Sequence, residues 1–242
     1  RDKLTSRGLR KKGVLALAPG NPMMDNLKKT NPPKNLCDYR RLILLCGSRL
    51  PEAIDNFKRL ITAIELIKSK NNIAILVALG SEPKISTIEL YLSRLGYKKE
   101  SVFEDKIDAQ SIWSKDSKVF LVGSGNFSRW ASWAEVGVAN AGTATEQLVG
   151  LGVPALSLPG KGPQFKRSFA KRQSRLLGGS VVPCKSPSIL AHRIEFLLQE
   201  KSLITQLGKI GIKRMGQKGG SASIAKLIRN ILLKDAKNQK EE

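Results

Sequence analysis

The sequence has few of the residues that build most catalytic and metal sites. It contains a single histidine, His192, and three widely spaced cysteines. Three separate cysteines favour neither a disulfide framework nor a zinc site, and a reducing compartment is the simple interpretation. His192 lies in a stretch with helical apolar spacing, so we expect it to be a surface or packing residue of a helix. A Ser-His-Asp triad, a Cys-His pair and a multi-histidine metal site are then excluded.

Long apolar runs are also absent. The best run, Ile73–Leu79, has the length of a strand, whereas about 20 residues are needed to cross a bilayer. The N-terminal residues do not follow the basic, apolar, small-residue order of a secretory signal. We therefore expect a cytoplasmic protein. Because the chain starts at Arg1 rather than at a methionine, we also expect it to be a fragment of a longer protein.

Acidic and aromatic residues are scarce as well. The chain has 42 Lys and Arg against 20 Asp and Glu, a net charge of +22, and thirteen aromatic residues. Such a charge favours nucleic acid, an anionic membrane surface or a phosphate-bearing substrate as partner. No aromatic-rich or RNP-like pattern accompanies the basic clusters at Arg7–Lys12, Lys166–Arg175 and Lys209–Lys218, so nucleic acid is the least favoured of the three.

Two periodicities alternate along the chain. Short apolar runs bounded by Gly or Pro are typical of buried parallel strands, and they lie at Val14–Ala18, Leu42–Cys46, Ile73–Leu79, Val119–Val122, Val136–Ala139, Ala155–Leu158 and Val181–Val182. Amphipathic stretches with helical spacing lie at Pro51–Ser69, Ile85–Leu95, Thr143–Leu151, Gln164–Leu177, Ser188–Glu200 and Ser221–Leu233. This alternation predicts an α/β fold with a doubly wound, Rossmann-like parallel sheet and right-handed crossovers.

The pattern divides the chain into three parts. Residues 1–38 include the proline-rich stretch Gly20–Asp38, and we expect them to be the remnant of a first domain and an interdomain connection. Residues 39–233 hold most of the strand and helix pattern and are expected to form one domain. Residues 234–242 are charged and are expected to be a frayed tail.

Ligands of doubly wound sheets bind beyond the carboxyl ends of the strands. Four loops follow predicted strands, at Gly47–Leu50, Gly123–Phe127, Asn140–Glu146 and Pro159–Gln164. In the first loop, Ser48 offers a hydroxyl and Arg49 a two-pronged donor next to a helix start, which suits a diphosphate. A plain turn, with Gly, Pro and Glu in favourable positions, explains the same residues equally well.

The third loop runs into a helix as AGTATEQ. Thr143 and Glu146 have the spacing of a capping box, which is the simpler explanation of these two residues. A capping box does not explain the small residues Gly142 and Ala144, which permit close approach of a ligand to the backbone. A carboxylate at a helix start can also accept both hydroxyls of a ribose. The two roles are compatible.

The other two loops are less specific. Pro159–Gln164 contains two glycines, two prolines and Lys161, a composition that fits a phosphate site and a surface turn equally. The Gly-Ser-Gly sequence that begins at Gly123 is more often a plain turn. The sequence has neither GxGxxG after its first strand nor GxxxxGK[ST], so NAD-binding and P-loop functions lose their main support.

In combination, the motifs GSR–PE, AGTATEQLVGLGVPALSLPGKGPQF and AKRQSRLLG resemble the C-terminal half of lipid-A-disaccharide synthase. They resemble more closely the cyanobacterial and plastid family called lipid-A-disaccharide synthase-related, as does GNPMMD at Gly20–Asp25. The resemblance implies the C-terminal domain of a GT-B glycosyltransferase that needs no metal and no other cofactor. It implies a UDP-sugar donor, a lipid-linked or glycan acceptor, and work at a membrane surface. Neither the sequence nor the resemblance determines whether the protein forms a homodimer.

The resemblance also assigns site residues. Ser48 and Arg49 would lie at the diphosphate, and Gly142 and Thr143 would supply close-approach backbone and a hydroxyl. Glu146 would take the ribose hydroxyls, and Gln164 would lie near the donor sugar. The Asn-Leu…Pro-Glu…Gln pattern of the disaccharide synthase is not recognisable after Val182, so its acceptor is not carried over. The family's catalytic base is expected in the first domain, most of which is not in this sequence, and no catalytic residue is assigned.

Two other functions remain open. One is a non-catalytic or truncated module that binds a nucleotide sugar. The other is an enzyme that resembles UDP-sugar 2-epimerases, which share the fold and the ribose-binding carboxylate, so Glu146 does not discriminate between them. Such epimerases usually employ histidines and several acids, whereas this chain has His192 alone.

Overall fold

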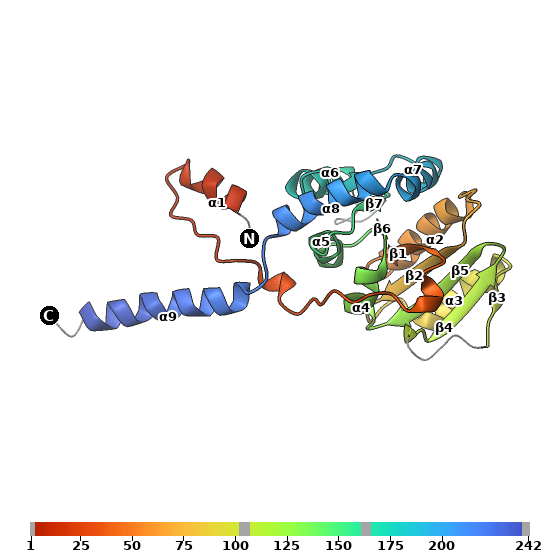
Figure 1. Cartoon of the computed structure of the whole chain (residues 1–242), viewed down its shortest axis with the longest axis horizontal. Helices are drawn as coiled ribbons and strands as arrows, with labels where there is room; N and C mark the ends of the chain where they lie inside the picture. The colour runs from red at the N-terminus through yellow and green to blue at the C-terminus, as the bar shows by residue number, and fades with distance from the viewer. Residues whose placement is uncertain (1–2, 102–106, 161–165, 239–242) are drawn as a thin grey trace.

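The computed structural model describes residues 3–101, 107–160 and 166–238. In this part of the chain, eight strands form one sheet that has helices on both faces (Figure 1). The strands are β1 (Arg40–Leu45), β2 (Ile73–Leu79), β3 (Lys98–Lys99), β4 (Ser111–Lys115), β5 (Lys118–Ser124), β6 (Val136–Ala139), β7 (Ala155–Ser157) and β8 (Val181–Pro183). The helices are α1 (Lys3–Arg10), α2 (Glu52–Glu65), α3 (Ile85–Arg94), α4 (Phe127–Trp133), α5 (Thr143–Gly150), α6 (Arg167–Leu176), α7 (Pro187–Gln199), α8 (Lys201–Met215) and α9 (Gly220–Asn238), with 3-10 turns η1 (Pro22–Met24) and η2 (Lys34–Leu36).

The strands lie in the order β3-β4-β5-β2-β1-β6-β7-β8. From β5 to β8 all neighbours are parallel, while β3 and β4 form an antiparallel edge. All seven residues of β2 are buried, which explains its unbroken apolar sequence, because a central strand is covered on both faces. The predicted doubly wound, Rossmann-like sheet is confirmed, with an antiparallel edge added to it.

Each face of the sheet has its own apolar core. On one face α2, α3 and α7 pack against the strands, with Phe57 and Leu190 among the buried side chains. On the other face α4 and α5 contribute Trp130 and Leu148. Because helices cover both faces, the chain adds strands first on one side of β1 and then on the other side. This reversal of direction produces the crevice described below.

The reversal occurs between β1 and β6. The chain passes from β1 to β2 and β5 on one side, and then returns to β6 on the other side of β1. The helices that follow β1 and β6 lie on opposite faces, so the two loops diverge at the carboxyl ends of adjacent parallel strands. Such a switch point is the usual ligand site of an open α/β sheet.

Some expectations for the secondary structure are wrong. Val14–Ala18 is not a strand: it is irregular, and Leu15 is 93% exposed, because no strand pairs with this segment within the described ranges. Helix α8 is not indicated by the sequence, because two internal glycines lower its helix propensity. Helix α9 ends at Asn238 rather than at Leu233, where the apolar spacing predicts its end. None of the described helices combines the length and apolar character needed to cross a bilayer.

The connection before β1 is fastened to the C-terminal helices. Asn21 accepts the hydrogen bond that caps η1, and its Nδ2 donates to the carbonyl oxygen of Met215 at 2.8 Å. The carboxylate of Asp25 accepts hydrogen bonds from the backbone N–H groups of Gly219, Gly220 and Ser221 at 2.7–3.1 Å. Asp25 therefore caps the first turn of α9, which extends away from the sheet together with α1 (Figure 1).

This cap makes the stability of the α9 attachment depend on pH. The hydrogen bonds from Ser221, and those from Gly219 and Gly220, lower the pKa of Asp25 from 3.8 to about 2. A lowered folded-state pKa means that the stabilisation is complete above about pH 4 and is lost as the pH falls through about 2. We expect Asp25→Ala to melt below the parent protein at pH 7, and the difference to shrink progressively below pH 4. A difference in melting temperature that is unchanged down to pH 2 would contradict this role.

Candidate functional site

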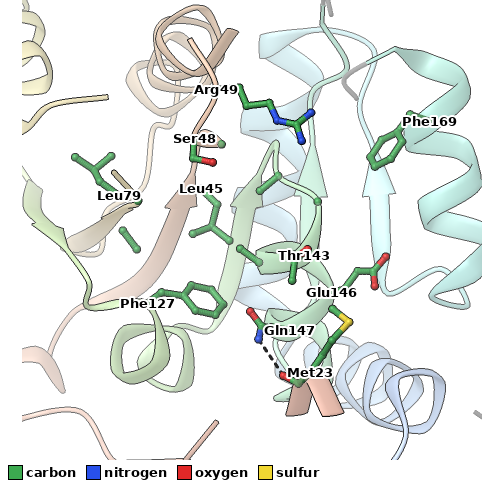
Figure 2. A pocket seen from close by; sticks show the side chains of 16 residues that line it. Met23, Leu45, Ser48, Arg49, Leu79, Phe127, Thr143, Glu146, Gln147 and Phe169 are labelled. Carbon is green, nitrogen blue, oxygen red and sulfur yellow. Dashed lines mark hydrogen bonds between the residues drawn. The ribbon is translucent and has the colours of Figure 1, made fainter. Parts of the chain in front are cut away.

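The loops that follow β1, β2 and β6 surround a cavity of about 660 Å³ at the switch point (Figure 2). Its lining comes from the ends of β1 and β2, the three loops, η1 and the helices α4, α5 and α6. The residues are Met23, Leu45, Gly47, Ser48, Arg49, Ala78, Leu79, Gly80, Phe127, Ala141, Gly142, Thr143, Ala144, Glu146, Gln147 and Phe169. Five of the six predicted site residues are in this lining. The sixth, Gln164, lies outside the described residues.

One wall of the cavity is the loop between β1 and α2. Gly47 has a φ of +89°, a conformation that L side chains rarely adopt, and it turns the chain immediately beyond the strand. Ser48 and Arg49 follow in exposed positions, and Figure 2 shows Arg49 reaching from this loop across the strand ends. The turn explains the glycine. It does not require a guanidinium group at the edge of the cavity.

The facing wall is the N-terminus of α5. Gly142 is the N-cap, and its carbonyl oxygen accepts from the N–H groups of Thr145 and Glu146. The predicted capping box is therefore wrong: Thr143 is the first helical residue, and no side chain caps this helix. Within the described residues, the N–H groups of Thr143 and Ala144 meet no acceptor.

The cavity combines a cation, a helix N-terminus and a carboxylate. Among the described lining residues, Arg49 is the one cation and Glu146 the one carboxylate. Glu146 lies one turn beyond the start of α5, so an anion at that start and a hydroxyl-bearing group beside it fit together. Phe127 and Phe169 stand on opposite sides of the cavity and offer flat apolar surfaces (Figure 2).

A buried network of amide side chains joins these loops. Asn140 follows β6, and its side chain both donates to the Leu158 carbonyl at 2.8 Å and accepts from the Leu158 N–H at 2.9 Å. It also donates to Asn56 of α2, which in turn donates to the carbonyl oxygen of Cys46. Arg59 donates to the carbonyls of Leu158 and Pro159. The ends of β1, β6 and β7 are thereby held in one arrangement.

Two glutamines connect the first turn of α5 to the neighbouring elements α6 and η1. Gln173 of α6 is buried, and its Nε2 donates to the carbonyl oxygens of Ala141 and Gly142 at 3.3 and 3.4 Å. Gln147 of α5 donates to the carbonyl oxygen of Met23 at 2.9 Å, which brings η1 to the rim of the cavity (Figure 2). The turn before α5 is thus supported by the helix that follows β7 as well as by its own strand.

Some of these residues are not indicated by the sequence pattern. The loop at Gly80 was overlooked, although it follows the clearest predicted strand and begins with a glycine. Asn56 is a polar residue on the apolar stripe of α2, between Ala53 and Leu60, and that position was an available signal. Phe169 carries no such signal, because only the tertiary structure places α6 beside the cavity.

The described residues offer no alternative nucleophile or metal centre at this site. Burial raises the pKa of the Cys46 thiol to about 12, so the thiol is protonated at neutral pH. His192 is exposed on α7 and does not line the cavity, as expected of a surface residue. Within the described ranges, no three residues among His, Cys, Asp and Glu gather as metal ligands. The cavity is therefore suited to binding through Arg49, Glu146 and backbone N–H groups.

No protein-family model and no curated protein sequence matches the chain. Solved structures do match it. A putative UDP-N-acetylglucosamine 2-epimerase from Listeria monocytogenes has a TM-score of 0.64 at 16% identity, over 96% of this chain and 59% of its own. MurG from Acinetobacter baumannii has a TM-score of 0.53 at 17% identity, over 80% and 50%. The spinosyn rhamnosyltransferase SpnG, complexed with spinosyn aglycone, has a TM-score of 0.50 at 12% identity, over 92% and 60%.

These similarities concern the fold, because all three identities are below 20%. The chain spans 50–60% of the length of the three proteins. The chain therefore has the Rossmann-like α/β fold of the C-terminal domain of GT-B proteins.

Proposed function

We propose that this chain binds the nucleoside diphosphate sugar donor of a glycosyltransferase. The observation that carries the proposal is the convergence of Ser48, Arg49, Gly142, Thr143 and Glu146 on one cavity at the switch point. These residues come from two loops about a hundred residues apart in the sequence. Their residue types suit the parts of such a donor: a cation for the diphosphate, a carboxylate for the ribose hydroxyls, and a glycine that lets the ligand approach the backbone.

The diphosphate fits between Arg49 and the start of α5. A guanidinium group donates two parallel hydrogen bonds to phosphate oxygens, and the N–H groups of Thr143 and Ala144 add two more donors. A Cβ atom built on Gly142 would meet no protein atom within 4 Å, so the space above this residue is open for a phosphate to approach. We propose that Glu146, one turn further along α5, accepts the ribose hydroxyls.

We further propose that the chain is related to the lipid-A-disaccharide synthase-related family. This relation rests on the motifs AGTATEQ and PGKGPQF, of which the first lies at the cavity. In that case the donor is a UDP-sugar, the acceptor is lipid-linked or a glycan, and the leaving diphosphate is stabilised electrostatically without a metal ion. We assign no catalytic base to this chain. We propose that Gln164 lies near the donor sugar.

The test is the thermal stabilisation of the 242-residue chain by UDP. A ligand at about 100 times its Kd stabilises the folded state by about 2.7 kcal/mol, which raises the Tm of a chain of this size by about 5–10 °C. We expect Glu146→Ala and Arg49→Met each to remove most of that rise. Absence of a rise with every nucleoside diphosphate would overturn the proposal.

Two exposed residues outside the cavity provide matched controls. Arg94→Met and Glu200→Gln remove the same charges from α3 and from the end of α7, and each is expected to keep the full rise in Tm with UDP. An equal loss in the control and cavity variants would show that net charge, rather than the cavity, determines UDP binding.

Incubation with UDP-sugars separates the remaining alternatives. Release of UDP, or transfer of the sugar to an added acceptor, supports a transferase. Conversion of UDP-N-acetylglucosamine into its C2 epimer would support the epimerase-like alternative. Stabilisation by UDP without any turnover, in this chain and in a longer chain that includes it, would support a non-catalytic binding module.

A further inference from the structure

Positive charge is distributed unevenly along the chain. Between residues 147 and 234 there are sixteen Lys and Arg but two acidic residues, Glu195 and Glu200. Glu195 lies in α7, and Glu200 lies between α7 and α8. Helices α6 and α8 contain no acidic residue at all. The Lys and Arg residues of these two helices therefore have no acidic partner on their own helix.

The charged residues of α6 lie on its outward face. Ala170 and Gln173 are buried against the domain. At about 100° per residue, Lys171, Arg172 and Arg175 lie on the opposite side of the helix, and all three are exposed. Helix α6 also supplies Phe169 to the cavity, so its outward face begins next to the proposed donor site.

Helix α8 has the same arrangement. Gly208, Gly211 and Met215 are buried against α5, where a Cβ atom on either glycine would collide with a backbone carbonyl. Lys209 and Lys213, one turn apart, lie on the other side of the helix and are exposed.

The two helices adjoin at their C-terminal ends. Arg214 donates from Nε to the carbonyl oxygen of Leu176 at 2.7 Å, and Ile210 packs beside Gly178, just after α6. Basic clusters about forty residues apart in the sequence therefore form one surface. We call this surface the α6–α8 face and define it by Lys171, Arg172, Arg175, Lys209 and Lys213.

Apolar side chains lie among these cations. Leu176, Ile210 and Ile212 are 38%, 38% and 42% exposed, although each is a large aliphatic residue. Viewed around the helix axis, Ile210 lies on one side of Lys209 and Lys213, and Ile212 lies on the other side. Lysine and arginine heads that surround exposed aliphatic side chains are the pattern of a protein that lies in the headgroup region of an anionic bilayer.

We propose that the α6–α8 face binds the surface of an anionic phospholipid membrane. The cations contact the lipid phosphates, and the three aliphatic side chains enter the headgroup region between them. Nucleic acid is the less suitable occupant of this face, because a phosphate backbone gains nothing from exposed leucine and isoleucine and because neither α6 nor α8 carries an exposed aromatic residue. Membrane binding by this face does not require a nucleotide in the cavity, so it stands independently of the proposed function.

The test is cosedimentation of the 242-residue chain with vesicles of phosphatidylcholine alone or mixed with phosphatidylglycerol. We expect binding to the anionic vesicles only, and release at high salt. Each cation near an anionic surface contributes about a fivefold change in affinity, so Lys171→Glu/Arg172→Glu/Arg175→Glu is expected to weaken binding more than about 100-fold. Lys209→Glu/Lys213→Glu is a second variant that alters the same face from α8.

A matched control separates the face from net charge. Lys70→Glu/Arg94→Glu/Lys98→Glu changes the charge as much as the α6 triple variant, at exposed positions around β2, α3 and β3. It is expected to keep binding within about threefold, because these residues are not on the face. Equal losses in the control and in both face variants, or no binding of the parent chain to anionic vesicles at low salt, would overturn the proposal. Displacement of the bound vesicles by duplex DNA at lower concentration than by free phosphatidylglycerol vesicles would assign the face to nucleic acid instead.

Discussion

Asn140→Ala is expected to lower the free energy of unfolding by about 3–5 kcal/mol and the Tm by about 10 °C. The side chain is 4% exposed and makes three hydrogen bonds, to the N–H and carbonyl groups of Leu158 and to Asn56. Alanine leaves the N–H group of Leu158 and the Oδ1 of Asn56 without the partner that Asn140 supplies, while the carbonyl of Leu158 keeps only its hydrogen bond from Arg59. Each orphaned group costs about 1–3 kcal/mol, and this sum exceeds the value of a typical surface interaction. Chemical denaturation measures the change.

The control for this prediction is Asn71→Ala, which removes an exposed amide and is expected to change stability by less than about 0.5 kcal/mol. A double-mutant cycle between Asn56→Ala and Asn140→Ala then isolates the bond between the two side chains. Loss of either partner already disrupts the network, so the double variant should be less destabilised than the sum of the singles. An additive result, or a change at Asn140 no larger than at Asn71, would contradict the role of this network.

Gly208→Ala and Gly211→Ala are each expected to destabilise the protein by about 2–4 kcal/mol, although alanine has the higher helix propensity. A Cβ atom on Gly208 would lie well under 3.0 Å from the carbonyl oxygen of Gly152, and one on Gly211 would meet the carbonyl oxygen of Val149. Both obstacles are backbone atoms at the end of α5. They cannot rotate away, so α8 must move off α5. Thermal unfolding of the two variants checks this result.

Gly8→Ala is the matched control for the α8 glycines. Gly8 also lies inside a helix, α1, but a Cβ atom there would meet nothing within 4 Å. Propensity alone then operates, and the substitution is expected to be neutral or to stabilise by up to about 1 kcal/mol. Opposite signs at Gly8 and Gly208 identify helix contact as the cause. Stabilisation at all three positions would show that α8 does not pack closely on α5.

Much of the sheet was predictable because its strands are buried on both faces. The strand bounds predicted at Ile73–Leu79 and Val136–Ala139 coincide with β2 and β6. A central parallel strand has an unbroken apolar sequence and ends at a polar or glycine residue, and both features are local. Strands β3 and β4 are not indicated by the sequence, because β3 is two exposed lysines and β4, with the sequence SIWSK, has no unbroken apolar run.

The candidate site was predictable in its parts and not in its assembly. The sequence identifies the loops at Ser48 and Thr143 as strand-to-helix connections, since each follows an apolar run. It does not show that β1 and β6 are neighbours, because β2 to β5 lie between them in the chain. The capping box was wrong for a similar reason: spacing alone does not determine which residue begins the helix.

The sequence by itself determined the α/β class, the central strands and the types of residue at the strand ends, because local apolar period and glycine placement reflect burial directly. Only the tertiary structure decided three other features. It brings Arg49 and Glu146 to one cavity, it joins Asn56 to Asn140, and it makes α8 helical despite Gly208 and Gly211. Each of these depends on contacts between segments far apart in the chain, where the free energy of packing outweighs the local preference of the residues involved.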